Sequence, residues 1–142
     1  MKIEDNTQAC IDAETLAALR ALEIIGGKAE SYTKGLTPIK TGALRNSFTH
    51  RVDAYKKQVT VGSAISYAPY VELGTGKLYS PPPEWIESHA KKGRGLDKWY
   101  YKDEQGKWHV GYPRKGVHML QKGISNHLDE YKNIIETELK GE

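Results

Sequence analysis

The chain has a single cysteine, Cys10, and no apolar run that approaches the roughly 20 residues needed to span a bilayer. One cysteine excludes a disulfide within the chain, which fits synthesis in a reducing cytoplasm. We interpret Cys10 as an inert small apolar residue. No apolar signal core follows Met1-Lys2-Ile3-Glu4-Asp5, so we expect no cleaved secretion signal. Internal repeats and low-complexity segments are also missing from the sequence.

The sequence patterns that usually mark an enzyme are absent as well. The five histidines, at positions 50, 89, 109, 118 and 127, have no metal-binding spacing. The segment Gly74-Thr75-Gly76 is too short for a phosphate-binding loop, and no GxSxG motif occurs. A carboxylate such as Glu72 could pair with a histidine for acid–base chemistry. Since every other signal is missing, we expect no catalysis, no cofactor and no metal.

Length and composition indicate one domain, residues 1–142, with a modest core. Hydrophobic residues make up 38% of the chain and charged residues 27%. The net charge of +3 is mild, so it neither requires nor excludes contact with a nucleic-acid backbone.

Two long helices are predicted, over residues 8–36 and 116–140. In each segment apolar residues recur at steps of three and four, which places them on one helix face. They are Ala18, Leu22, Ile25, Ala29, Tyr32 and Leu36 in the first helix, and Leu120, Ile124, Leu128, Tyr131, Ile135 and Leu139 in the second. Gly26 and Gly27 predict either a kink or a close approach of another segment. Pro38 should end the first helix, and Gly141 should cap the second.

Between the helices, alternating residues predict antiparallel strands. Phe48, His50, Val52 and Ala54 share one face of a strand, and a turn at 55–57 leads to a second strand around Val59 and Val61. We interpret His50 as a structural residue on the apolar face. The fold class is therefore α+β: a long N-terminal helix, a small antiparallel β-sheet with a hairpin arm, and a long C-terminal helix, with both helices on one face of the sheet.

Residues 77–115 contain a variable loop and a basic aromatic hairpin. Residues 84–92 predict a short helix after three prolines, and aromatic runs around a glycine-containing turn predict a hairpin from Trp99 to Val110. Lys or Arg occurs at eight positions in 91–115 and an acid at three, a local charge of +5. Such a hairpin could bind a nucleic-acid strand. We favour instead a solvated hairpin or an arm that contacts a neighbouring subunit through Trp99, Tyr100, Tyr101 and Trp108, because charge runs are usually solvated.

The most distinctive stretch is 67–76, which follows the predicted hairpin (46–76 together). One interpretation is a strand-to-loop corner with a capped turn, and the other is an assembly surface. Glu72 lies among apolar residues, so we expect a half-buried carboxylate that needs a partner. Thr41 should cap a short helical turn that carries Arg45, and we predict that Arg45 pairs with Glu72.

Taken together, these segments resemble a known family. The pattern begins at Pro38 and includes Val59 to Gly62. Its most specific residues are Thr41, Gly42, Leu44, Arg45, Ser47, Tyr67, Ala68, Val71, Glu72, Gly74 and Thr75. This combination is similar to the gene-product-ten-like tail-component family of tailed bacteriophages and prophages. The resemblance covers about residues 36–76. The segment 112–120 differs from the Pro-Phe-Leu and Pro-Ala pattern of many members, and the insertion 91–110 is particular to this chain.

The resemblance implies a small α+β virion protein that completes the tail or neck at the head–tail junction. Such a protein assembles with itself as a ring, expected to be a hexamer, between the connector or stopper and the tail terminator or tail tube. It would be made in the bacterial host cytoplasm and reside in the virion neck, with no membrane contact. DNA passing through the bore could touch it, and a nucleic-acid-binding module using the hairpin 91–115 is the alternative function.

Overall fold

In a computed structural model of the protein, residues 7–39, 42–79 and 96–141 are described. The elements, in chain order, are α1 (Thr7–Leu36), α2 (Ala43–Ser47), β1 (Thr49–Asp53), β2 (Gln58–Gly62), α3 (Ala68–Leu73), a 3₁₀ turn η1 (Gly76–Leu78), β3 (Trp99–Lys102), β4 (Trp108–Gly111), α4 (Met119–Ser125) and α5 (Leu128–Lys140). The predicted α+β class is confirmed. The short helix predicted over 84–92 and the capping residue Thr41 lie outside the described residues.

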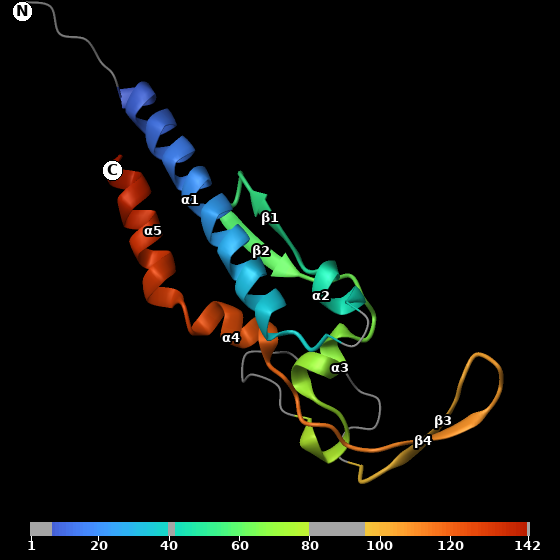
Figure 1. The fold of residues 1–142 in the computed structure, drawn as a ribbon. Coiled ribbons are helices and arrows are strands. Elements are labelled where there is room, and N and C mark those ends of the chain that lie inside the picture. Colours follow the sequence, from blue (N-terminus) through green and yellow to red (C-terminus); the bar gives the residue numbers. More distant parts are fainter. Residues whose placement is uncertain (1–6, 40–41, 80–95, 142) are drawn as a thin grey trace, which may run out of the picture.

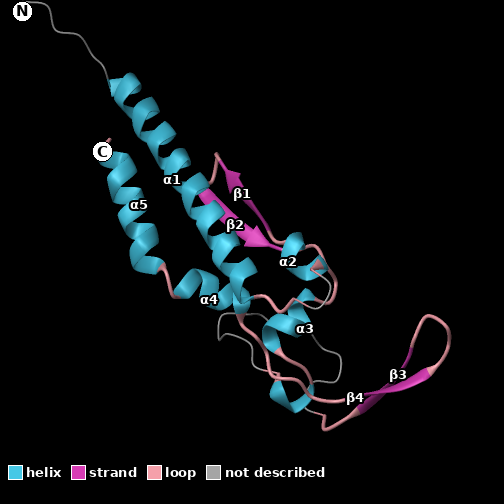
Figure 2. Cartoon of the chain, in the orientation of Figure 1, coloured by secondary structure: helices cyan, strands magenta, loops and turns pink. Residues whose placement is uncertain are grey.

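The elements form layers around α1 (Figure 1). The antiparallel hairpin β1–β2 packs on one side of α1, and α5 runs beside α1 on the other side. The helix α4 lies across the end of α1, and the β3–β4 hairpin projects away from the body. Figure 2 shows that helix dominates the body. The prediction that both helices cover one face of the sheet is wrong, because α1 lies between α5 and the hairpin.

The helix α1 confirms the predicted segment, but its buried stripe differs from the predicted one. Ala17, Ala21, Ile25, Ala29 and Thr33 are buried, at steps of four, while Leu36 is exposed. Small alanines face the neighbouring elements because α1 is contacted from two sides. Of the predicted stripe, Ile25 and Ala29 are buried, whereas Leu22 and Tyr32 are half-buried.

Gly26 explains how the hairpin can lie so close to α1. A Cβ atom at Gly26 would lie 2.5 Å from His50 Cδ2 and 2.8 Å from Val59 Cγ2. The helix continues through the two glycines, and the contact with the hairpin confirms the predicted close approach of another segment. At Gly27 nothing lies within 4 Å, so the second glycine has no such packing role.

The predicted helix over 116–140 is two helices. The helix is interrupted at Asn126 and His127. Across this interruption the hydroxyl of Tyr131 donates a hydrogen bond of 2.6 Å to the carbonyl of Gly123. The break changes which face is buried: Met119, Gly123 and Tyr131 pack inward. The predicted stripe is therefore mostly wrong, since the described side chains of Ile124, Leu128, Ile135 and Leu139 are exposed.

Two apolar clusters hold the body together. The first contains Leu44, Phe48, Ala68 and Met119, and it joins α2, α3 and α4. The second contains Ile25, Ala29 and Tyr131, with Val59 and Val61 from the hairpin packed against it. The central stretch 42–76 therefore lies at the junction between the sheet and the C-terminal helices.

Candidate functional site

Six of the residues that carry the family resemblance lie at or beside the entrance to α4: Leu44, Ala68, Val71, Glu72, Gly74 and Thr75. Leu44 and Ala68 are buried in the cluster with Phe48 and Met119, and Val71 packs against the same cluster. The stretch predicted as a strand-to-loop corner is instead the short helix α3 followed by η1, so that prediction is wrong. Pro69 occupies the first turn of α3, where its missing N–H leaves no hydrogen bond unmade.

Glu72 is the buried centre of this region, with only 5% of the residue exposed. Its carboxylate accepts hydrogen bonds from the backbone N–H groups of Leu120 (2.8 Å) and Gln121 (2.9 Å). These are orphan donors of the first turn of α4, which has no side-chain cap of its own at His118. Glu72 therefore caps α4 from another element, and the helix N-terminus balances its charge.

The backbone on either side of Glu72 pairs with the chain that enters α4. The N–H groups of Val117 and His118 donate to the carbonyls of Val71 (2.9 Å) and Glu72 (3.0 Å). Thr75 N–H donates to the Arg114 carbonyl, and the Thr75 hydroxyl accepts from Arg114 N–H, both at 2.9 Å. Hydrogen bonds thus join the segments 71–75 and 114–121 along their whole length.

Two glycines make this contact possible. Gly74 has a φ of 85°, and a Cβ there would lie 2.7 Å from the Arg114 carbonyl oxygen. Opposite it, a Cβ on Gly116 would lie 2.6 Å from the Glu72 carbonyl oxygen. Both positions therefore require glycine, since a side chain at either one would clash with the facing backbone.

The predicted ion pair between Arg45 and Glu72 is wrong. Both residues lie in the described part of the chain, and no ion pair joins them there. Both Glu72 oxygens instead accept hydrogen bonds from backbone N–H groups in the first turn of α4. Arg45 instead sits half-buried in the last turn of α2.

Gly42 and Ser47 fix the short helix α2 at its two ends. Gly42, with a φ of 77°, occupies the position before Ala43 that was predicted for Thr41. The Ser47 hydroxyl donates to the Leu44 carbonyl and lies 2.6 Å from the Ser63 hydroxyl. This places α2 against the chain that leaves β2 and leads into α3.

The predicted hairpin is confirmed as β3 and β4, which pair from Trp99↔Gly111 to Lys102↔Trp108. We call residues 99–111 the arm. At its tip, Asp103 accepts hydrogen bonds from the N–H groups of Gln105 and Lys107 at 2.9 Å each. His109 lies 2.7 Å from the same carboxylate, and this contact, together with the two N–H bonds, lowers the pKa of Asp103.

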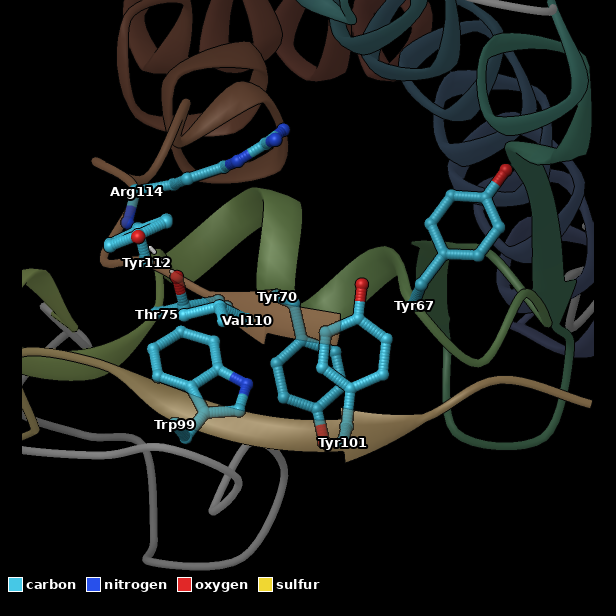
Figure 3. A pocket seen from close by; sticks show the side chains of 9 residues that line it. Tyr67, Tyr70, Thr75, Trp99, Tyr101, Val110, Tyr112 and Arg114 are labelled. Carbon is cyan, nitrogen blue, oxygen red and sulfur yellow. Dashed lines mark hydrogen bonds between the residues drawn. The ribbon is translucent and has the colours of Figure 1, made fainter. Parts of the chain in front are cut away.

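Between the arm and α3 lies a hollow of about 450 Å³ (Figure 3). The residues that line it are Tyr67, Tyr70, Thr75, Trp99, Tyr101, Val110, Gly111, Tyr112 and Arg114. Five aromatic side chains from distant parts of the chain thus gather with one arginine. A second hollow of about 390 Å³ shares Tyr67, Tyr70, Thr75 and Arg114 and adds Lys115. Trp, Tyr and Arg are the residue types most enriched at the energetic centres of protein interfaces.

The sequence predicted the arm residues but missed Tyr112 and Arg114. Both lie in the stretch where the chain departs from the family pattern, so the resemblance carried no information there. The available signal was local: an aromatic residue and two basic residues next to Pro113, directly after a predicted strand.

A second polar cluster joins β1 to α1. The imidazole of His50 lies 2.7 Å from Glu23 Oε1 through Nε2 and 3.1 Å from Glu30 Oε2 through Nδ1. The hydrogen bond to Glu23 raises the pKa of His50, and the bond to Glu30 adds to this effect against partial burial. The interpretation of His50 as structural fits this position, because both ring nitrogens are used to bind α1.

A third cluster joins α5 to α1. The Tyr32 hydroxyl donates to Glu130 at 2.7 Å, and Lys28 lies 2.9 Å from the same carboxylate. These two contacts lower the pKa of Glu130, with the Tyr32 bond as the larger cause. The ring of His127 stacks on Tyr32 at 3.6 Å. The cluster holds the break between α4 and α5 against α1.

Within the described ranges, no three His, Cys, Asp or Glu side chains are placed to hold a metal ion. No helix there is both long and apolar enough to cross a membrane, α1 included.

Comparisons with models of protein families, with curated proteins and with solved structures return no match to this chain.

Proposed function

We propose that the protein is a structural virion protein of a tailed phage or prophage, a tail-completion or neck component at the head–tail junction. It would assemble as a ring between the connector and the tail tube, after synthesis in the host cytoplasm. Its role would be to bind copies of itself and its neighbours in the particle, with no catalytic step.

One observation carries the proposal: six residues of the family-like pattern lie together at the junction of α2, α3 and α4. Leu44, Ala68 and Val71 pack together, and Glu72, Gly74 and Thr75 fasten the entrance to α4. The pattern therefore behaves as a folding unit that fixes the base from which the arm projects.

The arm supplies a second line of support. It is a two-stranded ribbon outside the body, and such a ribbon is marginal in water without a surface to pack on. It nevertheless exposes Tyr100 and Trp108 to solvent. Exposed aromatic side chains on such a ribbon are candidate contacts for a neighbouring subunit.

The location in the particle tests the proposal. An antibody or gold label directed at an affinity tag on the protein should mark the junction between head and tail in electron micrographs of purified particles. Mass spectrometry of the same particles should find several copies per particle. A protein that is missing from purified particles, or that labels only the capsid surface, would contradict the proposal.

A nucleic-acid-binding module is the second candidate, and the arm again is the reason. Lys98 lies 5.8 Å from the centre of the Tyr100 ring and Lys102 lies 5.0 Å from that of Trp108. Aromatic rings beside lysines are the usual platform for single-stranded nucleic acid. This candidate requires the purified chain to shift a labelled oligonucleotide, with an affinity that falls as salt rises.

A further inference from the structure

The hollow between the arm and α3 presents two kinds of side chain together. Five aromatic rings line it, and Arg114 lines both this hollow and the adjoining one, where Lys115 joins it. Among the described residues that line the two hollows there are two cations and no acid. A ligand that matches both features carries flat rings and negative charge.

The arm holds two of the rings in fixed positions. Trp99 and Tyr101 are two residues apart on β3, so both lie on the face of the arm that is turned toward α3 (Figure 3). A Cβ atom at Gly111 would collide with the indole of Trp99, so the indole lies against the backbone of β4. The ring of Tyr101 stacks on His109, which in turn lies 2.7 Å from the Asp103 carboxylate. Side chains that are already ordered lose little entropy when a ligand binds.

A third ring and the two cations are open to solvent. Tyr112 is 64% exposed. Arg114 and Lys115 are exposed as well, and in the part of the chain that the structure describes no carboxylate pairs with either side chain. The backbone of Arg114 is fixed by its two hydrogen bonds with Thr75. Both cations therefore extend from a fixed backbone and are available to an anion.

The chain around the hollow is also basic. Residues 98–115 contain five lysines or arginines and two acids, a net charge of +3. Both acids, Asp103 and Glu104, lie in the turn at the tip of the arm, and neither lines the hollow. Just before this stretch, Asp97 is paired with Lys77 at 2.9 Å. The charge of this region is thus complementary to an anionic ligand.

We propose that the hollow binds single-stranded nucleic acid. Its bases would stack on Trp99, Tyr101 and Tyr112. Its phosphates would bind to Arg114 and Lys115. Each nucleotide carries a flat base and a phosphate, so a strand uses both kinds of lining residue at once. An acidic side chain of a peptide would use the cations alone, and an apolar side chain the rings alone. This inference rests on the second candidate function, for which it names the site, and it is independent of the place of the protein in a virion.

Fluorescence anisotropy of the purified chain with a labelled strand of about 12 thymidines tests the contribution of the rings. Tyr112→Leu should weaken binding about tenfold, as the loss of one stacking ring does. Tyr55→Leu is the matched control, because Tyr55 is 94% exposed in the turn between β1 and β2, and it should change binding less than about twofold. Tyr112 is exposed and lies outside the strands, so circular dichroism should show an unchanged fold.

The salt dependence of binding tests the cations separately. Arg114→Gln should reduce the slope of log affinity against log salt concentration by about 0.7, the value for one phosphate contact on a single strand. Lys56→Gln, which removes one positive charge from the turn between β1 and β2, is the matched control and should leave the slope unchanged. If Arg114→Gln lowers the affinity with no change in slope, Arg114 does not bind a phosphate and this part of the proposal is wrong.

Photo-cross-linking locates the bases. A strand that carries 5-iodouracil should cross-link to Trp99, Tyr101 or Tyr112, as identified by mass spectrometry of the digested adduct. Cross-links at Tyr100 or Trp108 would place the strand on the opposite face of the arm. That result would overturn the proposed site and leave the second candidate function in place.

Four results of the binding assay would overturn the inference. They are no binding at about 0.1 mM protein in low salt, and competition equal to that of the unlabelled strand by a duplex of the same sequence, by polyglutamate or by free thymidine monophosphate. The duplex and polyglutamate offer charge without accessible bases, and the mononucleotide offers one unit without a strand. Absence of binding would also remove the second candidate function, whereas the proposed virion function depends only on the labelling of particles.

Discussion

The buried carboxylate of Glu72 offers the sharpest test of how this fold is held together. Glu72→Ala removes both acceptors for the N–H groups of Leu120 and Gln121 and leaves those donors without partners. A hydrogen bond to a charged group contributes about 1.5–3 kcal/mol, so we expect a loss of about 3–5 kcal/mol in the free energy of unfolding. This is a large fraction of the roughly 5–15 kcal/mol that a domain has.

Glu72→Gln should separate the hydrogen bonds from the volume of the side chain. The amide keeps one acceptor oxygen but turns an NH₂ group toward a backbone N–H, so one bond is lost and we expect about 1.5–3 kcal/mol. Glu104→Ala, at the exposed tip of the arm, is the matched control and should stay within about 0.5 kcal/mol.

Chemical denaturation followed by far-ultraviolet circular dichroism measures all three variants. The expected order of stability is wild type and Glu104→Ala together, then Glu72→Gln, then Glu72→Ala. A destabilisation of less than about 1 kcal/mol for Glu72→Ala would refute the view that this carboxylate caps α4, because even an ordinary helix cap contributes that much.

Three further predictions concern other parts of the fold. Gly74→Ala should destabilise the protein by at least about 2 kcal/mol, because Gly74 has a positive φ and there is no space for a Cβ. Gly27→Ala, in a helix with nothing within 4 Å of the added Cβ, should stabilise it by about 0.5–1 kcal/mol. Thermal melts compare the two variants. Because the pKa of His50 is raised in the folded state, its contribution to stability is full below about pH 6.5 and is lost as pH rises through the folded-state pKa. The wild type should therefore lose stability between about pH 6 and pH 8, and His50→Gln should reduce that loss. Tyr131→Phe removes the bond across the α4–α5 break and should cost about 1–2 kcal/mol in urea titrations. Burial raises the pKa of Tyr131 to about 12, so the wild type should also lose stability from about pH 10 upward, and the variant should lose less over the same range.

Local patterns were sufficient for much of the secondary structure. The first helix, both hairpins and the end of the last helix at Gly141 follow from periodicity, alternation and glycine placement. These features depend on residues close together in sequence, whose geometry the backbone itself dictates.

Which face of the C-terminal helices is buried could not be predicted in the same way. The aliphatic stripe of Leu128, Ile135 and Leu139 looks like a buried face, but the described fold buries Met119, Gly123 and Tyr131 instead. Gly123 is buried because Thr33 of α1 approaches it, and a Cβ there would lie 2.5 Å from Thr33 Oγ1. Contacts between a small residue and a distant helix leave no periodic signal.

The partner of Glu72 illustrates the same limit at the candidate site. The sequence indicated correctly that this carboxylate needs a partner, and Arg45 was the natural choice by charge. The actual partners are two backbone N–H groups 48 and 49 residues away. Every residue type supplies such donors, so only the tertiary arrangement identifies them.

The most direct test of the proposed function is the phenotype of deleting the gene from the phage or prophage in which, on that proposal, it resides. Electron micrographs of lysates should show DNA-filled heads and separate tails, and expression of the intact chain, but not of Glu72→Ala, should restore joined particles. Joined particles at the normal frequency without the gene would contradict the assignment to the head–tail junction.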